Sequence, residues 1–145
     1  MTINTRRPDS ADTVVRVAEE ILSTASMAVL GPSGRECLLC YVQRMVATHG
    51  CDTTLRFAQH FRAVRAPRAT ALERRLISKG GFCDCEIFLN AYDVSPEVWS
   101  PEIVRTYDCC GVQMLEQAPL PSCYGVRTGS TQPCPVWAPR LRGWW

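Results

Sequence analysis

Two tight pairs of cysteines constrain this sequence more than any other feature. One pair lies in CLLC, at Cys37 and Cys40, and the other lies in GGFCDCE, at Cys83 and Cys85. A CxxC pair can offer two sulfur ligands to one ion from a single turn, and a CxC pair can do so where the backbone turns at Asp84. Structural zinc sites are commonly built from four cysteines. We therefore predict one tetrahedral Zn²⁺ site with the ligands Cys37, Cys40, Cys83 and Cys85.

The remaining cysteines leave other ligand sets open. Cys51, in HGCD between two predicted helices, is an alternative ligand that can replace one member of the predicted set. Cys109, Cys110, Cys123 and Cys134 allow a weaker second metal site, but adjacent cysteines and long spacers carry little specificity. Free cysteine is often buried, so ordinary packing is the alternative role for some of these sulfurs.

In the second predicted helix, the CLLC cysteines lie on a different face from the apolar residues. At helical spacing, the apolar stripe of residues 36–49 consists of Leu38, Val42, Met45 and Val46. Cys37 and Cys40 fall on the other side of the helix, which favours a role other than filling the core. His49 falls on the stripe, so we expect a core or capping residue rather than a ligand, and we expect His60 to face solvent.

Composition and the N-terminus argue for a cytoplasmic protein. No apolar run reaches the roughly 18 residues of a membrane span, and the start of the chain, MTINTRRPDSADT, is polar and lacks the apolar stretch of a secretion signal. Without export, disulfides are not expected. The count of nine cysteines is odd, so a complete disulfide framework would leave one thiol over.

Positive charge gathers in one stretch although the net charge of the chain is only +2. The stretch from Asp52 to Lys79 contains seven cationic side chains and only two carboxylates. The arginines of this candidate RNA or partner surface are Arg56, Arg62, Arg65, Arg68, Arg74 and Arg75. Such a surface can contact RNA phosphate, and its alternative is a solvated helical face.

Hydrophobic periodicity predicts a mainly α protein, a small bundle of about four to five helices stapled by the four-cysteine zinc site. The predicted helices are 10–28, 36–49, 53–64 with Asp52 as its cap, and one that starts at Pro67 or Arg68 and ends before Gly80. Residues 82–92 fit a helix or a strand, and we favour a helix because a lone strand has no evident pairing partner. A short helical piece is expected around 98–104.

The domain organisation follows from these elements. We expect a flexible arm at 1–9, a helical zinc-binding domain at 10–105, and an irregular tail containing Pro, Gly and Cys at 106–145. The zinc ion would join the second helix to the segment after the fourth, and a small core often needs such a staple.

Four stretches in the same order resemble a known family: ECLLCYVQRM, HGCDTTLRFAQHF, APRATALERRL and GGFCDCEIFLNAY. They are similar to an actinobacterial family of small cysteine-rich proteins of unknown function, over roughly residues 35–92. The same stretches resemble a mycobacterial factor that recruits a hibernation-promoting protein to ribosomes during zinc starvation. The resemblance implies zinc-sensing CLLC and CDCE cysteines in a zinc-responsive, non-enzymatic adaptor of translation control. The expected partners are the ribosome, the hibernation-promoting factor, or both.

Two other functions are open. A nucleic-acid-binding module stapled by zinc would use the arginine surface, and a thiol redox protein would use Cys37 and Cys40 if a helix N-terminus lowers a thiol pKa. The helical pattern lacks the βαβ context of thioredoxin-like proteins. We predict no catalytic residues, since the sequence shows no phosphate loop, dinucleotide fingerprint or paired Ser–His signature.

Overall fold

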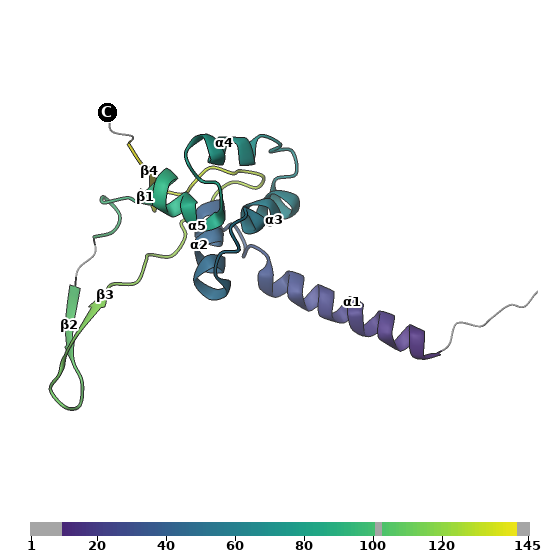
Figure 1. Cartoon of the computed structure of the whole chain (residues 1–145), viewed down its shortest axis with the longest axis horizontal. Helices are drawn as coiled ribbons and strands as arrows, with labels where there is room; N and C mark the ends of the chain where they lie inside the picture. Colours follow the sequence, from purple (N-terminus) through teal and green to yellow (C-terminus); the bar gives the residue numbers. More distant parts are fainter. Residues whose placement is uncertain (1–9, 101–102, 142–145) are drawn as a thin grey trace, which may run out of the picture. The chain divides into compact units, whose positions relative to one another are not determined.

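The computed structural model describes residues 10–100 and 103–141 (Figure 1). The chain divides into two compact units, Met1–Gly31 and Pro32–Trp145. In chain order the elements are α1 (Ser10–Leu30), α2 (Leu38–His49), α3 (Arg56–Arg65), α4 (Leu72–Ser78), α5 (Asp84–Glu86), the π-helix η1 (Ile87–Ala91), and the strands β1 (Tyr92–Val94), β2 (Ile103–Tyr107), β3 (Gln113–Gln117) and β4 (Trp137–Pro139). Helices are the main regular structure, and the predicted arm at 1–9 lies outside the described residues.

Helix α1 forms the regular part of the first unit. Its predicted range of 10–28 is confirmed and extended to Leu30. The apolar side chains of its periodic pattern, including Val14, Val17 and Ile21, are at least half exposed. None of the described helices is long and apolar enough to cross a membrane.

Helix α2 lies at the centre of the core of the second unit, where it packs against α3 and α5. The predicted apolar stripe is confirmed, because Leu38, Val42 and Met45 are buried. Tyr41 is also buried, and its ring lies 5.8 Å from the ring of Phe61 on α3. Helices of this length are stable mainly through such tertiary contacts.

Helix α3 begins later than predicted and has a different cap. Asp52 accepts a hydrogen bond from the backbone N–H of Thr54 at 3.0 Å, so it closes the turn before the helix rather than capping it. The buried carboxylate of Asp84 takes the capping role instead. Its two oxygens accept from the N–H groups of Phe57 at 2.9 Å and Ala58 at 3.2 Å. A capping residue that is distant in sequence left no local signal next to the helix.

Residues 82–92 contain both of the structures that the sequence allowed. The favoured helix is confirmed by the single turn of α5 and by η1, and the chain then becomes extended in β1. Strand β1 pairs antiparallel with β4, with Tyr92 opposite Pro139 and Val94 opposite Trp137. The expectation that no pairing partner exists was wrong, because the partner comes from the predicted tail.

The C-terminal segment lies in the second unit, which extends across the domain boundary predicted at 105. Strands β2 and β3 form a hairpin across that boundary, with Arg105 opposite Leu115, and β2 begins inside the range expected to be helical. Further along, Cys134, Val136 and Trp137 are buried. A few buried apolar and sulfur-containing side chains therefore anchor this segment. Its polar, proline-rich composition gave no indication of that anchoring.

Candidate metal centres

The structure gathers seven cysteines into two separate groups. Within each group the sulfur atoms all lie within 4.8 Å of one another. The first thiol group consists of Cys37, Cys40, Cys123 and Cys134. The second thiol group consists of Cys51, Cys83 and Cys85. The structure thus does not bring the CLLC and CDCE pairs into one four-sulfur group, and each pair finds other partners.

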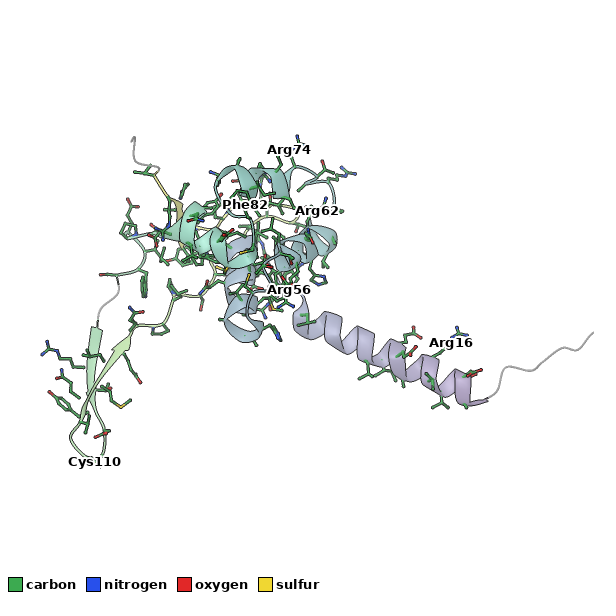
Figure 2. All side chains as sticks on the ribbon, viewed as in Figure 1. Arg16, Arg56, Arg62, Arg74, Phe82 and Cys110 are labelled. Carbon is green, nitrogen blue, oxygen red and sulfur yellow. The ribbon has the colours of Figure 1, made fainter. Side chains whose placement is uncertain are left out.

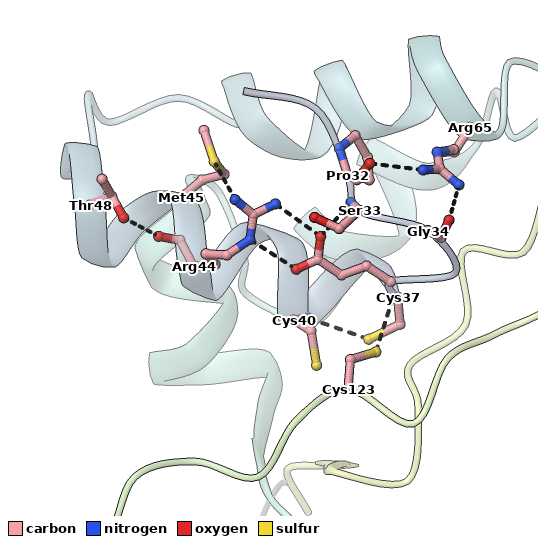
Figure 3. A network of polar contacts seen from close by, with 11 residues as sticks. Pro32, Ser33, Gly34, Cys37, Cys40, Arg44, Met45, Thr48, Arg65 and Cys123 are labelled. Atoms are coloured by element: carbon pink, nitrogen blue, oxygen red, sulfur yellow. Dashed lines mark hydrogen bonds and ion pairs between the residues drawn. The ribbon is translucent and has the colours of Figure 1, made fainter. Parts of the chain in front are cut away.

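The first thiol group joins the start of α2 to the C-terminal segment. Cys37 is the N-cap residue of α2, and its sulfur accepts the backbone N–H of Cys40 at 3.3 Å (Figure 3). The backbone N–H of Cys37 in turn donates to the sulfur of Cys123 at 3.2 Å. The sulfurs of Cys40 and Cys134 lie 3.8 Å apart. Two residues that the sequence assigned only to a weak second site therefore complete the CLLC pair.

Further N–H groups point at these sulfurs. The N–H of Gly125 donates to Cys123 at 3.3 Å, and Gly125 has a φ of +81°, which favours glycine. The indole Nε1–H of Trp137 donates to Cys40 at 3.3 Å. Hydrogen bonds from N–H groups favour thiolate over thiol, because they stabilise the charged form. The group is therefore arranged to hold negative sulfur.

The pKa values inside the first thiol group are pushed apart. The hydrogen bond with the Cys40 thiol lowers the pKa of Cys37 to about 5, although burial acts in the opposite direction. The same interaction, followed by burial, raises the pKa of Cys40. Burial also raises the pKa of Cys134. Without metal, the lowered pKa favours a thiolate at Cys37, and the raised pKa values favour thiols at Cys40 and Cys134.

Polar contacts fix the segment that leads into α2. Arg44 binds Glu36 through two nitrogens, each 3.0 Å from a carboxylate oxygen, and Glu36 also accepts the N–H of Ser33 at 2.9 Å (Figure 3). On the other side, the N–H of Val126 donates to the carbonyl of Arg35 at 2.9 Å. These bonds hold the chain near Cys123 against the chain near Cys37, which preorganises the four sulfurs.

The second thiol group lies between the end of α2 and the start of α5. The sulfurs of Cys83 and Cys85 are 3.2 Å apart, and the backbone N–H of Asp84 donates to the carbonyl of Thr54 at 3.0 Å. This bond and the Asp84 cap of α3 attach the CDC segment to the chain that follows Cys51. Cys51, which the sequence analysis named as an alternative ligand, is thus the residue that lies beside the CDC pair.

Charge on the second thiol group is concentrated on Cys51. Burial opposes the Cys51 thiolate, but hydrogen bonds from the backbone N–H groups of Cys85 and Thr53 outweigh it and lower the pKa. Interactions with the thiols of Cys83 and then Cys51 raise the pKa of Cys85 to about 12. The directions of these two pKa shifts favour a thiolate at Cys51 beside a thiol at Cys85, and a metal ion would displace that proton.

Cys109 and Cys110 belong to neither group. They occupy the exposed turn of the β2–β3 hairpin, where Figure 2 labels Cys110, and their sulfurs lie 3.7 Å apart. The backbone N–H of Cys110 donates to Asp108, which closes the turn. Two exposed, adjacent thiols on a hairpin cannot enclose an ion as the other groups can.

The candidate arginine surface is largely engaged within the protein. Arg62 lies 3.3 Å from Glu73, and Arg56 lies 3.7 Å from Asp52 (Figure 2). Arg65 donates to the carbonyl of Pro32 at 2.8 Å. Arg75 donates to the hydroxyl of Thr131 at 2.7 Å. Arg68 and Arg74 have no ion pair or side-chain hydrogen bond with the described residues, and both are exposed.

Neither histidine is a member of a thiol group among the described residues. His49 is exposed in the last turn of α2, so of the two expected roles, core or capping, the core role was wrong. His60 does not face solvent as expected. The residue is half-buried, its ring lies 6.5 Å from that of Tyr41, and its buried Nε2 has no hydrogen-bond partner among the described residues.

The donor atoms fit zinc better than a hard cation. Sulfur ligands select zinc and other soft ions, whereas magnesium and calcium take oxygen ligands. Four sulfurs in the first thiol group match the coordination number of structural zinc, and three in the second leave one position. Both groups are therefore geometrically able to hold a metal ion.

Known proteins give the family context of these centres. Uncharacterized proteins of Mycobacterium bovis and of two Mycobacterium tuberculosis strains are each 35% identical to this chain over 80 residues, which span 55% of this chain and 77% of the relative. No solved structure matches the chain. The family described as "Protein of unknown function (DUF2695)" matches residues 38–90, a range that holds the whole second thiol group but neither Cys123 nor Cys134. The chain therefore belongs to the DUF2695 family, which confirms the predicted membership of a family of unknown function.

Proposed function

We propose that this protein is a zinc-binding, zinc-responsive adaptor without catalytic activity, and that each thiol group holds one Zn²⁺. The observation that carries the proposal is the convergence of seven sulfurs from five separate chain segments into two groups. Packing alone gives sulfur no reason to gather in this way, whereas a shared ion does.

The first thiol group has the properties of a structural site. Its four sulfurs fill the tetrahedral shell of zinc, which leaves no position for water or substrate. Two of the ligands, Cys123 and Cys134, fix an otherwise irregular segment to α2. Structural zinc contributes about 10–16 kcal/mol of apparent binding free energy in small domains, so it can replace the missing regular structure there.

Metal content tests this proposal directly. Native mass spectrometry of the reduced, purified chain is expected to show two zinc ions per chain. Cys134→Ser and Cys85→Ser are each expected to lose one ion, from different groups. Cys110→Ser is the matched control, because it removes an exposed thiol outside both groups and should retain both ions. A chain that takes up no zinc under reducing conditions contradicts the proposal.

We further propose a cytoplasmic adaptor role in ribosome hibernation, in which zinc occupancy controls the recruitment of a hibernation factor to the ribosome. This part is supported by the sequence resemblance of residues 35–92. Thiolate sites lose zinc when free zinc falls, because protons and chelators compete for the sulfurs. Occupancy can therefore change the surface that a partner meets.

Co-sedimentation tests the adaptor role. Ribosomes, the hibernation factor and this protein are mixed at high zinc and after chelation, and the pelleted factor is measured. The proposal expects recruitment that depends on this protein and changes with zinc, with Cys85→Ser locked in the low-zinc behaviour. Equal recruitment with and without the protein contradicts it.

A thiol redox function has one observation in its favour, the pKa of about 5 at Cys37. Burial counts against it, because the Cys37 side chain is fully enclosed and a disulfide substrate cannot reach the sulfur. An insulin-reduction assay separates the two functions, since the adaptor is expected to show no turnover with added reductant.

A further inference from the structure

The second thiol group has one sulfur fewer than tetrahedral zinc requires, and its surroundings select the missing donor. Zn²⁺ with three thiolates carries a net charge of −1, and the carboxylate of Asp84 is buried between two of the ligands. Glu86 follows Cys85 directly in the sequence, and its carboxylate accepts the backbone N–H of Phe82 at 3.0 Å. A fourth anionic ligand would add repulsion at short range, whereas a neutral nitrogen donor adds none. The site therefore favours an imidazole.

The chain contains two histidines, and one is placed for this role. His49 is exposed, ends α2, and lies two positions before Cys51. His60 lies on α3, and its ring faces Tyr41 rather than the second thiol group.

His49 and the CDC segment both contact Phe57. The ring of His49 lies 6.2 Å from the ring of Phe57. The backbone N–H of Phe57 is bound at 2.9 Å by Asp84, which stands between Cys83 and Cys85. His49 and the second thiol group thus approach Phe57 from opposite parts of the chain.

The turn that joins His49 to Cys51 is held in place. Gly50 has a φ of +76°, which reverses the chain after α2. The guanidinium of Arg56 donates to the Gly50 carbonyl at 3.1 Å and lies 3.7 Å from Asp52. These contacts hold the backbone of the turn, while the His49 side chain is exposed.

We propose that His49 is the fourth ligand of the second thiol group, so that this centre is a zinc site of three cysteines and one histidine. This inference rests on the proposed function, because it requires that the second group binds metal. On metal binding the imidazole leaves Phe57 and closes the coordination shell. The two centres of the protein then differ in ligand type as well as in position.

Cadmium NMR of the full chain tests the inference, because the ¹¹³Cd chemical shift reports the number of sulfur ligands. Two signals are expected from the wild type, one from four sulfurs and one from three sulfurs and a nitrogen. His49→Ala is expected to move the second signal only and to weaken zinc binding at that centre at least about 10-fold, as loss of an outer-shell partner already does. Added imidazole should restore the original signal. His60→Gln is the matched control and should change neither signal.

The outcomes separate this inference from the proposed function. Two signals that are both unaffected by His49→Ala overturn the His49 assignment and give the fourth position to water or to a donor from a partner. A single signal, from four sulfurs, shows that the second group binds no metal, and the proposed second zinc site then fails as well. Circular dichroism of His49→Ala confirms that the variant is folded before either conclusion is drawn.

Discussion

The two thiol groups differ in how the chain assembles them. The first draws its sulfurs from the start of α2 and from two points of the C-terminal segment, whereas the second lies between the 51–54 turn and α5, inside the range that matches the family. The first has four sulfurs and the second has three. Under the proposed function, the four-sulfur site that closes a long chain segment would serve stability, and the three-sulfur site between short connections would respond to zinc. The contrast teaches that a cysteine-rich sequence can hold two centres with separate tasks.

The largest expected effect comes from removing a ligand of the first group. Cys134→Ser should lower the free energy of unfolding by more than about 4 kcal/mol, because it removes a structural metal. Limited proteolysis should then cut the chain between β3 and β4, which the wild type protects. Thermal unfolding and mass spectrometry of the fragments measure both effects. Equal destabilisation by Cys85→Ser would remove the contrast between the groups.

A smaller effect is expected at the connection between the second group and α3. Asp84→Ala leaves the N–H groups of Phe57 and Ala58 without their acceptor, which should cost about 1–3 kcal/mol. The same change should weaken zinc binding at the second group only, because Asp84 positions the sulfurs on either side. Chemical denaturation and zinc competition with a chromogenic chelator give the two values. Asp52→Ala, which alters an exposed turn, provides the comparison and should have the weaker effect on stability.

Trp137 offers a way to weaken the first group alone. Trp137→Phe removes the indole N–H that donates to Cys40 at 3.3 Å and keeps an aromatic ring beside Phe88, whose ring lies 5.0 Å away. Zinc affinity of the first group should fall by about 10-fold, the lower end of outer-shell effects. Trp99→Phe removes an indole bond to the Pro119 carbonyl and should leave zinc affinity unchanged. Competition titrations with both variants make the comparison.

The last expected effect is a pH dependence that concerns the metal-free protein alone. The pKa of Cys37 is about 5 in the folded chain against an ordinary value of 9.0. A lowered folded-state pKa adds stability above the unfolded-state pKa, and this stability is lost as the pH falls through the folded-state pKa. The free energy of unfolding should therefore decrease as the pH is lowered from about 9 to about 5. Ultraviolet thiolate absorbance measures the ionisation of Cys37, and denaturation at several pH values measures the stability. Cys37→Ser should remove the pH dependence that arises from this thiol.

The sequence predicted the helical elements better than the ligand sets. Periodicity identified α2 and its buried face because Leu38, Val42 and Met45 repeat at helical spacing. The pairing of Cys37 and Cys40 with Cys123 and Cys134 could not be predicted, because spacing says nothing about which distant turn returns to a helix start. The docking of the tail on the helices could not be predicted for the same reason. Val136 and Trp137 are too few to produce a periodic pattern, although they are buried.

The distribution of ligands along the chain also sets an order of events during synthesis. All three cysteines of the second group have been made once Cys85 has been added, whereas the first group waits for Cys134. That interval is about 50 residues, or roughly 2–10 s at common rates of translation. If both groups bind zinc as proposed, a nascent chain can fill the second group before the first. Zinc scarcity at that moment would be registered before the C-terminal segment has a place to dock.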